Sequence, residues 1–143
     1  MNRAAVQSVL LATGLLAAAA GCARDCQPTV RDGWIRSGPP SMPMRAGFGR
    51  IVNDCDVPLV VSGASSADFA DVSLHETTVV DGISRMRPVP ELQVPARGDI
   101  VLAPGGLHLM LADPRSEPAA GDALVIEFAL RDGGTLRGEF EVR

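Results

Sequence analysis

The stretch at residues 124–143, LVIEFALRDGGTLRGEFEVR, determines the class of the fold. It divides into two halves around the turn sequence Asp132-Gly133-Gly134. Alternation of apolar with polar or small residues places one set on a buried face and the other in water, which is typical of an antiparallel sheet. The stretch therefore predicts a β-hairpin with one buried face. The apolar set is Leu124, Ile126, Phe128, Leu130, Leu136, Phe140 and Val142.

Short apolar runs separated by glycine and proline make up the rest of the chain. The 15 glycines and 11 prolines punctuate it as in all-β sandwiches and barrels. Prolines in residues 37–43 and 88–95 predict irregular segments, because proline cannot donate a ladder hydrogen bond. We expect a single all-β domain, an antiparallel sandwich or barrel of about eight strands. Besides the final hairpin, strands are predicted at residues 29–36, 46–53, 59–62, 71–80, 83–87, 99–102 and 107–111.

The N-terminus has the features of an export signal. Arg3 precedes an alanine-rich apolar run that ends in small residues, so residues 1–21 are interpreted as a signal peptide. Residues 19–22, AAGC, resemble a bacterial lipobox, in which Cys22 would carry the lipid. Ordinary cleavage near Ala20 is the alternative, and it would leave Cys22 as a spare thiol.

This interpretation divides the chain into a signal, a tether at residues 22–27 and one folded domain at residues 28–143. No later segment has the ~20 apolar residues needed to span a bilayer, so a lipid anchor would be the only membrane contact. We expect a periplasmic protein held at a bacterial membrane. Ala23, directly after the lipobox cysteine, favours the outer membrane.

The three cysteines also favour lipidation. An exported protein seldom leaves an odd thiol exposed, and lipidating Cys22 leaves Cys26 and Cys55 to pair in an oxidising compartment. We expect this disulfide to contribute ~3–4 kcal/mol by the chain-entropy model. Metal binding by the two cysteines is the weaker alternative, because they lack a close CxxC spacing.

Charge and residue types argue against several classes of function. The formal net charge is −4 and the sequence contains no lysine, so the clustered basic patch of a nucleic-acid-binding protein is missing. Neither histidine forms part of a serine–histidine–carboxylate arrangement, and no paired carboxylates lie near them in the sequence. We therefore expect a non-enzymatic protein that does not bind nucleic acid.

Two histidines and two methionines form the one set of residues that points to chemistry. The set is His75, Met86, His108 and Met110. In the predicted strand at residues 107–111, His108 and Met110 share a face, because residues two apart in a strand project the same way. Asp81-Gly82 is a strong hairpin signal, and it would return Met86 towards His75.

The donor types favour one metal ion. Thioether sulfur and imidazole suit Cu(I), whereas hard cations prefer oxygen and zinc prefers thiolate, imidazole or carboxylate. A blue-copper electron-transfer site would need a cysteine thiolate on the copper, which this set does not supply. Taken singly, each methionine is more often core filler and each histidine a surface residue. The joint pattern predicts a Cu(I) site.

The spacing His75-x10-Met86-x21-His108-x-Met110 resembles the signature of the PCuAC family of periplasmic copper chaperones. The sequences around the ligands agree, including Leu74-His75-Glu76 and Pro104-Gly105-Gly106-Leu107. The similarity extends over residues 28–143. It implies a cupredoxin-like Greek-key barrel that holds one Cu(I) at its surface, and a role in supplying copper to the CuA centre of cytochrome c oxidase alongside Sco-type proteins.

The sequence departs from some relatives, and it offers further candidate residues. It stops at Arg143 without a His/Met-rich tail, so a second Cu(II) site there is not expected. Met42 and Met44 could supply extra thioethers, with packing against the barrel as the alternative. Glu76 could orient the His75 imidazole, although a strand neighbour should point away. Arg85 and Arg87 could contact an acidic partner, with solvated strand residues as the alternative.

The resulting hypothesis is an exported, monomeric Cu(I) metallochaperone that passes its ion to an acceptor by ligand exchange. The expected acceptor is cytochrome c oxidase subunit II or a Sco-type chaperone. Two alternatives remain: a copper-sequestering or tolerance lipoprotein, and a structural lipoprotein in which the histidines and methionines are incidental.

Overall fold

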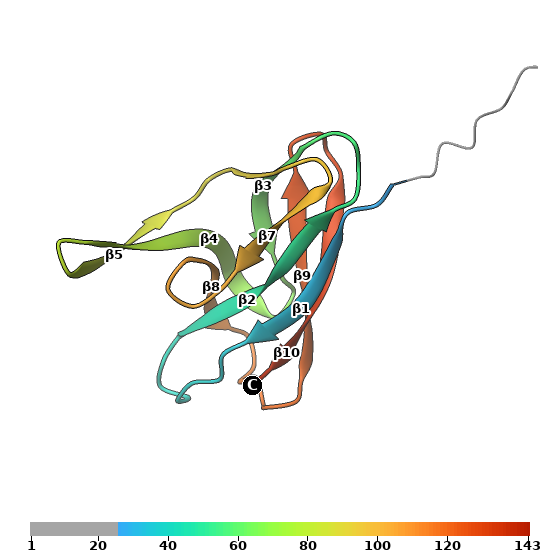
Figure 1. The fold of residues 1–143 in the computed structure, drawn as a ribbon. Helices are drawn as coiled ribbons and strands as arrows, with labels where there is room; N and C mark the ends of the chain where they lie inside the picture. The colour runs from blue at the N-terminus through green and yellow to red at the C-terminus, as the bar shows by residue number, and fades with distance from the viewer. Residues whose placement is uncertain (1–25) are drawn as a thin grey trace, which may run out of the picture.

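The computed structural model describes residues 26–143, which form ten β-strands. Figure 1 shows how the strands are arranged. The predicted signal peptide, Cys22 and most of the predicted tether lie outside the described residues. No helix within residues 26–143 is long and apolar enough to cross a membrane. The strands are β1 (Thr29–Ile35), β2 (Met44–Asn53), β3 (Leu59–Ser65), β4 (Phe69–Val80), β5 (Ile83–Pro88), β6 (Leu92–Val94), β7 (Gly98–Leu102), β8 (Leu107–Pro114), β9 (Ala123–Leu130) and β10 (Thr135–Val142).

Seven of the strands close into a barrel. Their order is β4-β8-β2-β1-β10-β9-β3, and a pairing of Ala64 with Val72 joins β3 back to β4. Strand β1 runs parallel to β10, and the other pairings are antiparallel. The all-β fold is confirmed. The strands number ten rather than about eight, and the expected antiparallel sheet contains one parallel pair.

The additional strands lie outside the closed barrel. Strand β5 extends β4, β6 pairs with β3, and β7 pairs with β2. The prediction that residues 88–95 are irregular was wrong at Leu92–Val94. Those three residues pair with Leu59–Val61, so the missing N–H groups of the flanking prolines do not interrupt the ladder.

The final hairpin forms as its alternation predicts. Phe128 of β9 lies opposite Leu136 of β10, and Phe128 and Phe140 are fully buried. Their ring centroids are 6.4 Å apart. The core continues through residues from most strands, so the sheet is anchored from inside the barrel. Its largest fully buried apolar members are Phe69, Phe128, Phe140, Ile35, Ile51, Leu109, Leu111 and Ile126.

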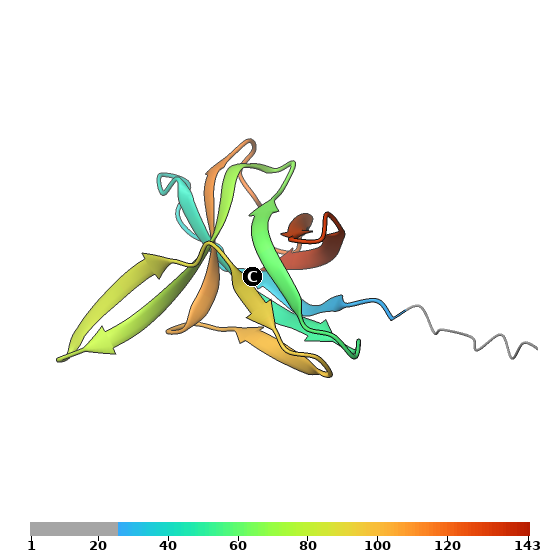
Figure 2. The same ribbon diagram turned by 90° about the horizontal axis from the view of Figure 1, so that it is seen from above.

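A long hairpin made of β4 and β5 projects from the barrel (Figure 2). Its turn residues, Asp81 and Gly82, have φ values of 52° and 76°. Positive φ at both central positions is what a tight two-residue hairpin turn needs. All six residues of β5 are exposed. This hairpin carries Met86 out of the sheet edge and back along the strand that holds His75.

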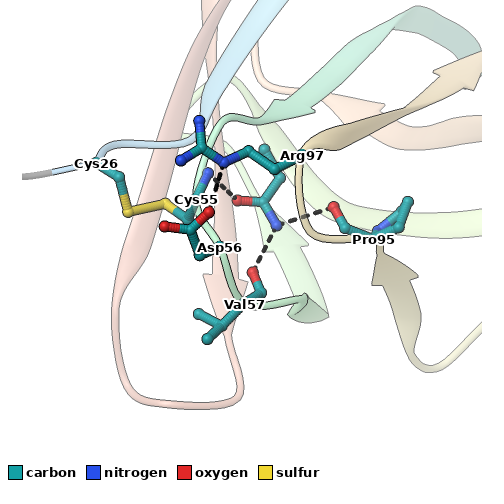
Figure 3. The surroundings of a disulfide bond; sticks show 7 residues. Cys26, Cys55, Asp56, Val57, Pro95 and Arg97 are labelled. Carbon is teal, nitrogen blue, oxygen red and sulfur yellow. Dashed lines mark hydrogen bonds and ion pairs between the residues drawn. A yellow bond between two sulfur atoms is a disulfide. The ribbon is translucent and has the colours of Figure 1, made fainter.

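A disulfide links Cys26 to Cys55, which follows the C-terminal end of β2 (Figure 3). The Cα atoms of the two cysteines are 5.3 Å apart. It ties the segment before β1 to the turn after β2. The buried Asn53 amide supports this turn: Nδ2 donates to the carbonyls of Val57 (2.9 Å) and Pro95 (3.0 Å), and Oδ1 accepts from the Cys55 N–H (3.1 Å). The expected pairing of these cysteines is therefore present in the structure.

Candidate metal centre

The four predicted donors lie on one face of three neighbouring strands. His75 on β4 is directly opposite His108 on β8. Met86 on β5 is opposite Thr77, which shares a face with His75 because the two are two residues apart. Met110 shares the His108 face for the same reason. The structure thus brings all four residues to one side of the sheet, and the copper assignment itself remains a prediction.

Leucines hold these strands from the other side. Leu109 and Leu111 are fully buried, and Leu74 of β4 lies opposite Leu109 and is 5% exposed. The alternation in residues 107–111 therefore separates the leucines in the core from His108 and Met110 on the outer face of the barrel. The metal-binding candidates sit on a rigid support, because core packing fixes the strands beneath them.

His108 is held in one tautomer by its backbone contact. Its Nδ1 lies 2.9 Å from the Gly106 carbonyl oxygen, and a carbonyl can only accept, so Nδ1 carries the hydrogen. In the neutral imidazole, Nε2 then bears the lone pair. That atom lies 3.2 Å from Sδ of Met86. Two lone-pair donors thus face each other, which is how a metal site is prepared by a second hydrogen bond on its histidine ligand.

His75 contributes the second imidazole. Its ring centroid is 6.1 Å from that of His108, with 34° between the planes. Nε2 lies 3.2 Å from the Ser73 hydroxyl. Among residues 26–143, Nδ1 of His75 is the buried side-chain polar atom without a hydrogen-bond partner. A buried polar atom left unsatisfied costs about 1–3 kcal/mol, and a metal ion bound to Nδ1 would remove that cost.

The surroundings of His75 favour its neutral form. Burial lowers the pKa of His75 below its usual value, the nearby His108 adds to the decrease, and Asp71 opposes it. Only the neutral imidazole can donate a lone pair to a metal. The site is therefore biased towards the protonation state that ligation requires.

Aromatic residues close the side of the site next to β2. The Phe48 ring is 6.5 Å from His108 and 4.5 Å from Trp34. The Arg36 guanidinium lies over both rings, 5.2 Å from the Phe48 centroid and 6.0 Å from the Trp34 centroid. Phe48 was missed as a site residue, although it sits on the predicted strand at residues 46–53 and its alternation could have placed it.

Glu76 does not orient His75. It pairs with Arg87 at 2.6 Å, and the two lie opposite each other on the hairpin, one residue out of step with His75 and Met86. The neighbour that does contact His75 is Ser73. Its position two residues before His75, on the same face of the strand, could have predicted this contact.

Within residues 26–143, no group of three or more His, Cys, Asp and Glu side chains is placed to hold a metal ion.

A cavity beside the disulfide lies away from these donors. It has a volume of about 490 Å³ and is lined by residues around the disulfide and the start of β3, including Cys55, Leu59 and Leu130. None of the four predicted ligands lines it.

Comparison with known proteins relates the chain to proteins described as putative lipoproteins. A family model described as "Putative lipoprotein LpqE-like" matches residues 28–142. A curated relative from Leifsonia xyli subsp. xyli (strain CTCB07), named "Putative lipoprotein Lxx21020", is 30% identical over 107 residues. That match covers 74% of this chain and 63% of the relative, which is less than two thirds of its length.

Solved structures show the same fold. The Cu(I) form of DR1885 from Deinococcus radiodurans has a TM-score of 0.67 and 28% identity, and the match covers 85% of this chain and 83% of that chain. Its apo form has a TM-score of 0.64 at 28% identity, with 100% and 96% covered. The copper-bound PCuAC domain from PmoF2 has a TM-score of 0.66 at 22% identity, with 81% and 92% covered. The predicted resemblance to PCuAC domains is thus confirmed at the level of the fold.

Proposed function

Because the chain belongs to the LpqE-like family, we propose that it is an exported lipoprotein that binds Cu(I) through His75, Met86, His108 and Met110 and delivers the ion to an acceptor protein. The observation that carries this proposal is the contact between Nε2 of His108 and Sδ of Met86, 3.2 Å apart. With Nδ1 of His108 engaged by Gly106, that contact joins an imidazole lone pair to a thioether, the donor combination that Cu(I) prefers.

The charge of the copper-loaded site supports a role in copper transport. Two neutral imidazoles and two thioethers leave the loaded site with the single positive charge of the ion. The donors also lose no proton when they bind, because both imidazoles already present a lone pair in the neutral form. Loading and release therefore need neither a redox step nor a proton acceptor.

Exposure suggests the order of release. Met86 is 53% exposed, whereas His108 is 6% exposed. An incoming ligand can therefore reach and replace the Met86 thioether while the imidazoles still hold the ion. The face of the hairpin that carries Met86 also presents Thr77, Val79 and Ser84, which are uncharged, so an acceptor can approach without desolvating a charge.

The acceptor in this proposal is a copper protein at a membrane surface. The family resemblance suggests the CuA centre of cytochrome c oxidase, reached directly or through a Sco-type chaperone. A lipid on Cys22 would confine the protein to a membrane surface in the periplasm and so restrict the partners that it can reach. Sequestration of copper is the alternative, and it predicts binding without transfer.

Competition with a chromogenic Cu(I) chelator tests the binding. The wild-type protein should bind one Cu(I) tightly, and the His108→Ala/Met110→Ala variant should lose that binding. Ile83→Leu, on the same exposed hairpin, is the matched control and should bind as the wild type does. Non-stoichiometric binding by the wild type, or full binding by the double variant, would overturn the site.

A transfer assay separates delivery from storage. Loaded protein is mixed with a metal-free CuA domain, with and without a Sco-type partner, and copper in each protein is measured after separation. Delivery predicts copper in the acceptor. Retention of copper by this protein in both mixtures would favour sequestration.

A further inference from the structure

A second group of thioethers lies beside the site described above. Met42, Met44 and Met110 line one cavity of about 210 Å³. Met42 and Met44 are 50% and 41% exposed, so two of these three residues reach the surface. Of the five methionines in the sequence, this cavity gathers three, and Met110 is shared with the proposed Cu(I) site.

Strand register explains why Met44 and Met110 meet. On the antiparallel pair β2–β8, Met44 lies opposite Ala112, and Ala46 lies opposite Met110. Met44 and Met110 are therefore diagonal neighbours on one face of the sheet. Such residues have Cα atoms about 7–8 Å apart, within reach of long side chains. The same face continues to His108, so the donors form a row that leads from Met44 to the main site.

A buried arginine fixes the loop that carries Met42. Arg45 is 4% exposed, and its guanidinium donates to the carbonyls of Met42 and Met44. It also pairs with Glu117, which neutralises its charge. The Met42 N–H donates to the Pro39 carbonyl at 2.9 Å. The loop is thus held by contacts to its own backbone, which leaves both methionine side chains available at the cavity.

We propose that Met42, Met44 and Met110 form a second, weaker Cu(I) site through which the ion passes to or from the first. Thioethers select a soft monovalent ion. Arg36 and Arg45 both line the same cavity. Arg45 is paired with Glu117, whereas the positive charge of Arg36 disfavours a cation there, which makes the site suited to transit rather than retention. This inference rests on the proposed function, since Met110 is the donor common to both sites.

Passage between the sites is a ligand exchange in which no electron and no proton is gained or lost. The Cu(I)–Met110 bond is kept, the bonds from Cu(I) to Met86 and to the two imidazoles break in turn, and bonds to the Met44 and Met42 thioethers form. Copper remains Cu(I) and no proton moves, because neither the thioether nor the neutral imidazole carries a proton on the donor atom.

Methyl NMR of the protein labelled with carbon-13 in its methionine methyl groups tests the second site. The protein is titrated with Cu(I) alone under reducing conditions. The first equivalent should shift the Met86 and Met110 methyl signals. The second equivalent, held by the Met42 and Met44 thioethers while Met110 stays with the first ion, should shift the methyl signals of Met42 and Met44. Methyl signals of Met42 and Met44 that do not move up to two equivalents would overturn the proposal.

A Met42→Leu/Met44→Leu variant provides the second arm, since leucine keeps the apolar volume and removes both sulfurs. We expect chelator competition to show one tight and one weaker equivalent bound by the wild type, and the tight equivalent alone bound by this variant. A variant that still binds the second equivalent would also overturn the proposal. Met86→Leu tests the first site separately: loss of the tight equivalent with this variant upholds the proposed function whatever the outcome at Met42 and Met44.

Discussion

His75 and His108 lie directly opposite each other on β4 and β8, with ring centroids 6.1 Å apart. Neither ring enters the core, because the leucines beside them occupy the barrel interior. Backbone pairing therefore sets the spacing of the imidazoles before any ion arrives. A site prepared in this way loses little conformational entropy on binding.

The hairpin turn should control the position of Met86. Gly82 has a φ of 76°, and a side chain in this left-handed region costs about 1–2 kcal/mol. We expect Gly82→Val to loosen the hairpin and lower Cu(I) affinity by up to about five- to thirty-fold, which is that cost expressed as a binding constant. Chelator competition measures the change.

Gly121→Val is the matched control for this variant. Gly121 has a φ of 93° and open space where a Cβ would be added, but its N–H donates to the Val142 carbonyl of β10 and it is not part of the β4–β5 hairpin. The control should lose similar stability and retain the wild-type Cu(I) affinity. Equal losses of affinity in the two variants would contradict the role of the β4–β5 hairpin.

His75 should titrate below its ordinary range in the metal-free protein. Burial lowers the pKa of His75 from 6.5, with His108 as the second cause and Asp71 opposing both. Because the unfolded chain then binds more protons, the metal-free protein should lose stability as pH falls below 6.5 towards the lowered pKa. NMR titration of the imidazole measures this directly.

Removing Asp71 tests the cause of that shift. The Asp71 carboxylate favours the charged imidazole, so Asp71→Asn should lower the pKa of His75 further. Cu(I) binding should then persist to lower pH, because protons compete less with the metal. A higher pKa of His75 in this variant would contradict the assignment.

The disulfide should stabilise the fold without serving the metal site. It joins residues 29 positions apart, which corresponds to ~3–4 kcal/mol in the chain-entropy model. We expect Cys26→Ser/Cys55→Ser to lose about that free energy of unfolding in denaturant melts and to keep its Cu(I) affinity. A loss of Cu(I) binding at temperatures where the variant is folded would show that the cysteines take part in the site.

Core truncation should be costly at Phe128. This side chain is fully buried and packs near Phe140, so Phe128→Ala should reduce the free energy of unfolding by about 3–5 kcal/mol. Val101→Ala, at a residue 49% exposed, is the control and should cost far less. Comparable losses in the two variants would contradict the burial pattern of β9.

Local patterns predicted much of this fold. Period-two alternation located the final hairpin and separated the leucines from His108 and Met110, because strand geometry alone determines which residues share a face. The turn Asp81-Gly82 was recognisable because two residues of positive φ have a narrow choice of sequence. That turn also predicted that the returning strand would bring Met86 back towards His75.

Contacts between distant segments were not predictable in the same way. The parallel pairing of β1 with β10 depends on barrel closure, which no local pattern encodes. Strand β6 is three residues long and exists through its pairing with β3. The Arg45–Glu117 pair is likewise set by tertiary packing, since residues 45 and 117 are 72 positions apart.

X-ray absorption of the protein loaded with one equivalent of Cu(I) tests the central claim most directly. The proposed site predicts a Cu(I) edge with both nitrogen and sulfur scatterers in the inner shell, and loss of sulfur scattering in a Met86→Leu/Met110→Leu variant. An inner shell without sulfur in the wild-type protein would contradict the assignment of His75, Met86, His108 and Met110 as the copper ligands.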